Sequence, residues 1–196
     1  MNKKLKVLAT LFLLLTLSLN AQNKTVDYLN IPGPINLDNK IYNLVWSSHP
    51  NENYYKQEYL SSNEKIEKYN TLALIEFVEG DFNLKDVIDQ KVNELENMKQ
   101  TNPIVNYKIY ENNDEYILDF LISENSQDGK EILIAERNVY RYKLITNNKV
   151  KGVMLFAISE RGYEKNMEKF FNALKSESSR LIEAVGNYKL PDIETK

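Results

Sequence analysis

The chain has 196 residues, which is enough for one domain with a sizeable apolar core. It has no cysteine and a single histidine, so thiol catalysis, cysteine metal sites, disulfides and multi-histidine metal sites are excluded. Its 25 basic and 28 acidic residues give a net charge of −3, which offers no broad attraction to nucleic acid or anionic lipid, and no nucleic-acid partner is expected.

Residues 1–21 have the layout of a secretory signal peptide. Three lysines lie among the first six residues, Val7 to Leu19 carry no charge, and Ala21 ends the run as a small residue. The thirteen uncharged residues are too few for a membrane span, which needs about 20. We therefore predict cleavage before Gln22 and a periplasmic or secreted location, with no membrane anchor after cleavage. Without these 21 residues and their three lysines, 175 residues and a net charge of −6 (22 basic against 28 acidic) remain.

The first half of the chain reads as strands followed by one helix. Residues 22–34 are expected to be extended, because prolines 32 and 34 fix φ and lack an N–H. Strands are predicted over residues 41–48, 54–60 and 72–79, the first of them ending before Pro50, with residues 61–70 as a loop or a short helical turn. A helix is predicted over residues 84–99, because apolar residues recur there at steps of three and four after Asn83 as N-cap.

The second half reads as four strands and a long helix. The strands are predicted over residues 105–111, 115–123, 132–145 and 150–159, with asparagine-rich tight turns after the first and third. The helix is predicted from about 164 to 185, with Gly186 as its stop and residues 189–196 as a flexible tail.

This order predicts an α+β fold with a mostly antiparallel sheet of about seven strands (β-β-β-α-β-β-β-β-α) and two packed helices, in a single domain over residues 35–188. The element order resembles that of the PsbP-like and DcrB-like group of exported or lumenal α/β/α sandwiches, from Ile35 to Tyr188. The resemblance rests on layout and no shared motif. It implies a non-enzymatic accessory or binding role, and it transfers no site residue.

Asp119 is the polar residue that the strand pattern explains least. Its neighbours from Tyr116 to Ile122 are all apolar or aromatic, so its carboxylate must face water, find a partner or hold its proton. If the 124–130 loop is symmetric, Asp119 opposes Ala135 and lies diagonally from Arg137. Two interpretations stay open, an ion pair on a partly covered sheet face and a polar spot in a binding groove.

A second candidate surface surrounds Arg141. Tyr140 and Tyr142 flank it, and tyrosine with arginine is typical of interface anchors. The same tyrosines share a strand face with Phe120 and Leu118, which favours core packing. The candidate binding residues are therefore Asp119, Arg137, Tyr140, Arg141 and Tyr142.

The catalytic motifs are weak. Ser48 and His49 point to opposite faces of a strand, and Ser47 lies two residues from His49 with no glycine-flanked nucleophile turn. We interpret His49 as a turn histidine and expect no metal, cofactor or catalytic residue. The sequence favours an exported, non-catalytic binding or accessory protein of the bacterial cell envelope, which uses a sheet surface or a helix–sheet groove to bind an envelope protein or small ligand. The alternative is a periplasmic hydrolase with a site of scattered Asp, Glu, Tyr and Ser residues.

Overall fold

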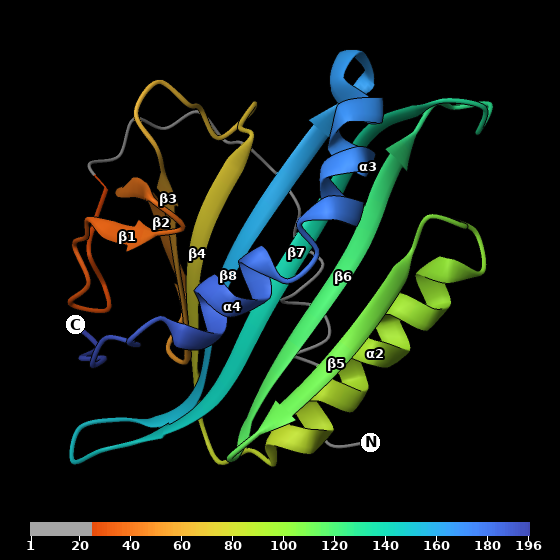
Figure 1. Ribbon diagram of the computed structural model, residues 1–196. Helices are drawn as coiled ribbons and strands as arrows, with labels where there is room; N and C mark the ends of the chain where they lie inside the picture. Colours follow the sequence, from red (N-terminus) through yellow and green to blue (C-terminus); the bar gives the residue numbers. More distant parts are fainter. Residues whose placement is uncertain (1–24) are drawn as a thin grey trace.

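The computed structural model describes residues 25–196, and the predicted signal peptide lies outside this range (Figure 1). The described chain forms one eight-stranded antiparallel sheet and three α-helices. In chain order these are β1 (Ile35–Leu37), β2 (Lys40–Asn51), β3 (Tyr54–Leu60), β4 (Thr71–Glu79), α2 (Leu84–Lys99), β5 (Asn106–Asn112), β6 (Glu115–Asn125), β7 (Ile132–Thr146), β8 (Lys151–Tyr163), a 3₁₀ turn (Glu164–Asn166), α3 (Met167–Ser176) and α4 (Arg180–Asn187). Among residues 25–196 no helix is long and apolar enough to cross a membrane.

The sheet consists of two meanders that meet in its centre. Its strand order is β1-β2-β3-β4-β8-β7-β6-β5. Hairpins join consecutive strands from β1 to β4 and from β5 to β8, with tight turns between β1 and β2, β2 and β3, and β5 and β6, and the longer loop 61–70 between β3 and β4. Helix α2 carries the chain from β4 to the far edge, so β5 becomes an edge strand and β8 pairs with β4.

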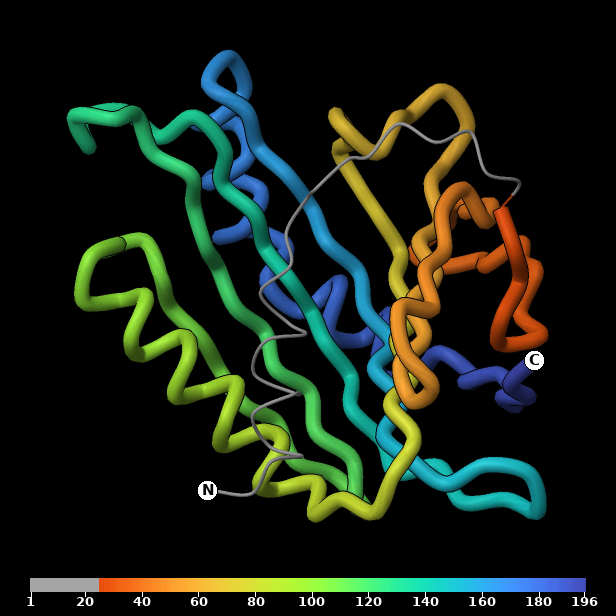
Figure 2. The backbone as a smooth tube through the Cα atoms, turned by 180° about the vertical axis from the view of Figure 1, so that it is seen from behind, coloured from red at the N-terminus to blue at the C-terminus, as the bar shows by residue number. Residues whose placement is uncertain are grey.

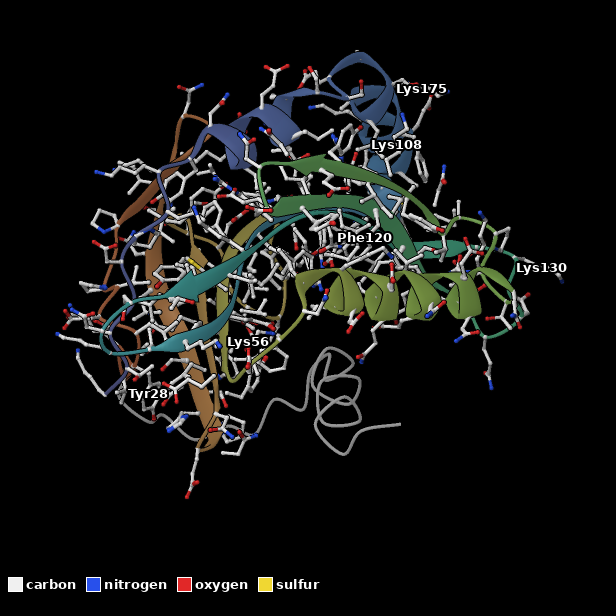
Figure 3. All side chains as sticks on the ribbon, turned by 90° about the horizontal axis from the view of Figure 1, so that it is seen from below. Tyr28, Lys56, Lys108, Phe120, Lys130 and Lys175 are labelled. Carbon is white, nitrogen blue, oxygen red and sulfur yellow. The ribbon has the colours of Figure 1, made fainter. Side chains whose placement is uncertain are left out.

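The helices cover opposite faces of the sheet. Figure 1 shows α3 and α4 in front of β7 and β8, and Figure 2, from behind, shows α2 on the other face. Two buried clusters result. One joins the inner side of α2 to Leu118, Phe120 and Tyr142, and the other joins Leu181 and Val185 of α4 to Ile75, Phe156 and the N-terminal segment. The sheet is strongly curled, which Figure 3 shows from below.

The two ends of the described chain lie side by side. The amide N–H of Glu194 donates to the carbonyl of Leu29 at 3.2 Å, and that of Lys196 donates to the carbonyl of Tyr28 at 3.1 Å. Ile193 is only 1% exposed. Residues 189–196, which we expected to be a flexible tail, therefore dock against the N-terminal segment.

The α+β class and the antiparallel sheet are confirmed, and three details differ from the sequence prediction. The sheet has eight strands instead of about seven, because Ile35–Leu37 pairs with the start of β2. Strand β2 does not end before Pro50. It continues to Asn51, since a register shift between Ser48 and Asn51 accommodates the proline. His49 is consequently a strand residue and not a turn residue.

The prediction of one long C-terminal helix is also wrong, because the structure has two helices there, α3 and α4. α3 ends at Ser176, and Glu177 leaves the helical region with φ −121° and ψ 34°. The break falls in a serine-rich stretch, where short hydroxyl side chains compete for backbone groups. The side chain of Arg137 donates to the carbonyl of Ser178, which fixes the connection against the sheet.

Candidate binding surface on strands β5 and β6

Asp119 and Arg137 form the predicted diagonal pair. Arg137 Nε lies 2.9 Å from Asp119 Oδ1, and Arg137 Nη2 lies 3.0 Å from Asp119 Oδ2, which is a two-point fork. The Arg137 side chain is only 6% exposed. This geometry bears out the ion-pair interpretation, while a binding role for the two residues stays a prediction.

The expected register between the two strands is wrong, although the face assignment holds. Asp119 opposes Val139 and not Ala135. Strand β6 continues to Asn125 and the register shifts beside Glu124, so the loop is not symmetric. The pairing moves by four residues, an even number, and side chains therefore stay on the faces that the alternation predicts.

Arg141 is also held by local partners. Its Nε lies 2.6 Å from Glu115 Oε2, and its Nη1 donates to the carbonyls of Val185 at 3.0 Å and Tyr188 at 2.8 Å. The last carbonyls of a helix have no partner within the helix, so Arg141 caps the C-terminal end of α4. Both arginines thus anchor the α4 region to β7.

Tyr140 and Tyr142 do not join these residues. They lie on the opposite face, where Tyr142 belongs to the core beneath α2 and Tyr140 packs against it with its ring 4.8 Å from Phe120. Burial raises the pKa of both tyrosines well above the ordinary value. The five candidate residues are therefore divided between the two faces, three beside α3 and α4 and two in the core.

A continuous open surface lies beside Asp119. We call it the β5–β6 face, and it consists of Asn106, Lys108, Tyr110, Ile117, Asp119 and Leu121. A pocket of about 190 Å³ lies at its Asn106 end, between these strands and Leu174 of α3. A second pocket of about 240 Å³ lies at its Tyr110 end, beside Gly186 of α4. The two hollows follow one another along β5.

The β5–β6 face is open because α3 and α4 lie over β7 and β8 and reach only the near side of β6 (Figure 1). Lys108 and Tyr110 are exposed, and Ile117 is half-buried. Sequence reasoning missed these residues. The polar and apolar alternation of Asn106–Asn112 indicates a half-exposed strand, but no pattern along the chain shows that it ends the sheet.

A third hollow, larger than the two along β5, holds three carboxylates. It measures about 630 Å³ and lies between the start of α2 and the β5–β6 turn, with Glu111, Asp114 and Glu115 in its lining. Partial burial alone would raise the pKa of Glu115, but hydrogen bonds and charges from Arg141 and Lys143 lower it. Glu111 accepts a hydrogen bond from Tyr116 at 3.0 Å. Glu115 is thus held as the ion, which does not suit a general acid.

A second charged cluster lies on the α2 side of β3 and β4. Lys56 Nζ lies 2.9 Å from Glu58 and 3.7 Å from Glu76. Burial raises the pKa of Glu76, and Lys56 opposes this rise. The exposed Trp46 ring lies 5.9 Å from the Lys56 ammonium. Alternate strand positions carry these residues, so the pattern was visible in the sequence, but Lys56 is already paired with both carboxylates.

His49 has partners that differ from a catalytic set. Its ring stacks on Tyr55 at 4.2 Å between centroids, and its Nδ1 lies 3.0 Å from the carbonyl oxygen of Tyr54. Ser47 Oγ accepts from the Val26 amide at 3.2 Å. Within residues 25–196 no group of three or more His, Asp and Glu side chains is arranged to hold a metal ion.

The model of one protein family matches residues 29–190, a range that contains every helix and strand described above. The chain belongs to that family. No curated protein and no solved structure matches it.

Proposed function

We propose that this chain is an exported, non-catalytic binding or accessory protein of the bacterial cell envelope, and that it binds its partner on the β5–β6 face. The observation that carries the proposal is the open face itself. Helices cover the neighbouring strands on both sides of the sheet, whereas Lys108 and Tyr110 stay exposed next to two hollows. Mixed apolar and polar surfaces of this kind suit protein or peptide partners.

The state of the charged groups supports binding over catalysis. Asp119 and Glu115 are each held by arginine, and the pKa of Glu115, one of the three carboxylates in the hollow of about 630 Å³, is lowered. A periplasmic hydrolase is the alternative, and the three carboxylates of that hollow are the observation that favours it.

Export rests on residues 1–21, and the resemblance of the predicted element order to that of PsbP-like and DcrB-like sandwiches suggests the accessory role. We expect the exported protein to start at Gln22, because Ala21 ends the apolar run. The intact mass of the protein recovered from the periplasm or medium tests this. A mass that retains residues 1–21 would contradict it.

A photo-crosslinking pair tests the binding face. A photoreactive phenylalanine analogue replaces Tyr110 in one variant and Trp46 in the other, since these aromatic residues are similarly exposed at 39% and 40% and lie on distant strands. In living cells we expect a defined crosslinked species from position 110 and none from position 46. Equal crosslinking at both positions, or none at position 110, would refute the proposed face.

A further inference from the structure

Strand β5 is an unprotected edge of the sheet. Its seven residues pair with β6 without a bulge, six of the seven are exposed, and it contains no proline. The Tyr107 N–H donates to the Asn106 side chain at 2.9 Å, which indicates that it points away from β6. Because antiparallel pairing alternates, the N–H and C=O groups of Ile109 and Glu111 also point away from β6. Such an edge is a template for another strand.

The side chains beside this edge carry positive charge without a partner. Lys108 lies opposite Asp119, but both Asp119 oxygens are taken by Arg137. Lys175 follows Leu174, which lines the same pocket as Lys108, and Figure 3 shows the two lysines on the same side of the molecule. Neither lysine forms an ion pair or hydrogen bond with another residue in the described range. They favour an acidic group in the partner.

The other face of the edge is the α2 side, where the Tyr107 hydroxyl donates to Glu96 of α2 at 2.8 Å and Ile109 is the exposed apolar side chain. Ile109 is 44% exposed and points to the side opposite Lys108, since successive strand residues alternate. A strand paired to β5 would place one side chain beside Lys108 and the next beside Ile109. Acidic and apolar residues must therefore alternate in the best partner.

Building on the proposed function, we propose that the partner supplies an extended segment of alternating acidic and apolar residues, which adds to β5 as a ninth strand. Its main chain pairs with the outward N–H and C=O groups of Ile109 and Glu111 and with the carbonyl of Tyr107, and an acidic side chain lies between Lys108 and Lys175. In strand addition, hydrogen bonds of the main chain supply the affinity, and the side chains at alternate positions supply the selectivity.

Selection from a display library of random linear peptides on the purified mature protein tests this inference. We expect enriched peptides in which Asp or Glu alternates with apolar residues. The best of them, synthesised and labelled, should bind Ile109→Val as tightly as the unmodified protein. Ile109→Pro removes an outward N–H and should weaken binding about tenfold or more. Equal thermal melting of the two variants shows that the fold is intact.

The charge contribution needs its own matched variants. Lys108→Glu with Lys175→Glu should weaken peptide binding by about 2- to 30-fold, and more at low salt. Lys65→Glu with Lys189→Glu makes the same charge change at exposed positions outside β5, β6 and α2 and should leave binding unchanged. This pair keeps the proposal testable if Ile109→Pro fails to fold.

Three results would overturn the inference. One is the absence of any enriched peptide, and another is undiminished binding to a folded Ile109→Pro. The third is a dimer in light scattering that Ile109→Pro converts to a monomer, which would make a second copy the occupant of the edge. If crosslinking at position 110 succeeds while Ile109→Pro has no effect, the envelope-binding role stands and strand addition alone fails.

Discussion

Arg137 and Arg141 show how single residues join the sheet to α4. Each pairs with a carboxylate of β6 and each also donates to a backbone carbonyl next to or within α4. The carboxylate contact of Arg137 could be predicted, because Asp119 stands in an apolar strand and alternation places both on one face. The carbonyl contacts could not, because they depend on where α4 ends in space.

Asp119→Ala should destabilise the protein by about 3–5 kcal/mol, because it leaves the Arg137 charge buried without its partner. Urea unfolding at pH 7 measures this. Asp89→Ala breaks the solvent-exposed pair with Lys85 and should cost about 0–1 kcal/mol. A loss below about half a kcal/mol for Asp119→Ala would show that water replaces the carboxylate.

The lowered pKa of Glu115 predicts how the stability of the protein changes with pH. The pKa of Glu115 in the folded state is lowered, so its contribution is present above the unfolded pKa and is lost as pH falls through the folded pKa. The difference in unfolding free energy between the natural protein and Glu115→Gln should therefore be largest near neutral pH and shrink below about pH 4. A difference that grew on acidification would contradict the ion pairs with Arg141 and Lys143.

At the scale of elements, hydrophobic period and turn residues predict most strands and helix α2. The misplaced boundaries have local physical causes. Pro50 stays within β2 because a register shift accommodates it, and the C-terminal helix breaks where the Arg137 side chain binds the Ser178 carbonyl. Period alone cannot show such breaks, because α3 and α4 both continue an apolar stripe.

The two C-terminal helices should contribute unequally to stability. Leu181 of α4 is fully buried, so Leu181→Ala should cost about 2–5 kcal/mol. No residue of α3 is fully buried, and Leu174→Ala, which makes the same chemical change at a half-buried position, should cost clearly less. Urea melts of the two variants compare them directly. Equal losses would mean that α3 anchors the sheet as firmly as α4.

At the scale of the whole molecule, the strand order could not be predicted. Nothing along the chain shows that α2 carries β5 to the far edge, so the open β5–β6 face was not foreseen. The docking of the C-terminal segment could not be predicted for the same reason. Residues 189–196 lack an amphipathic period, and their binding place consists of Tyr28 and Leu29, which lie far away in the sequence.

Ile193 should therefore behave as a core residue despite its place near the C-terminus. Ile193→Ala should cost about 2–5 kcal/mol in urea unfolding, because the side chain is fully buried. Lys189→Ala, at an exposed position of the same segment, should change stability by less than about 0.5 kcal/mol. Indistinguishable results would show that this segment is not docked in solution.

The meeting of β4 with β8 has a consequence for how fast the chain folds. Thr71 pairs with Glu160, so the middle of the sheet joins residues almost ninety positions apart, while every other strand pair is a local hairpin. Closing such a long loop costs chain entropy before any contact compensates for it, so this junction should limit the folding rate. We expect Phe156→Leu in β8 to slow refolding in stopped-flow experiments, and Leu37→Ala in the outer β1 hairpin mainly to speed unfolding. If instead Leu37→Ala slowed refolding and Phe156→Leu mainly sped unfolding, the rate-limiting step would lie in the outer hairpin, and the β4–β8 pairing would form after it.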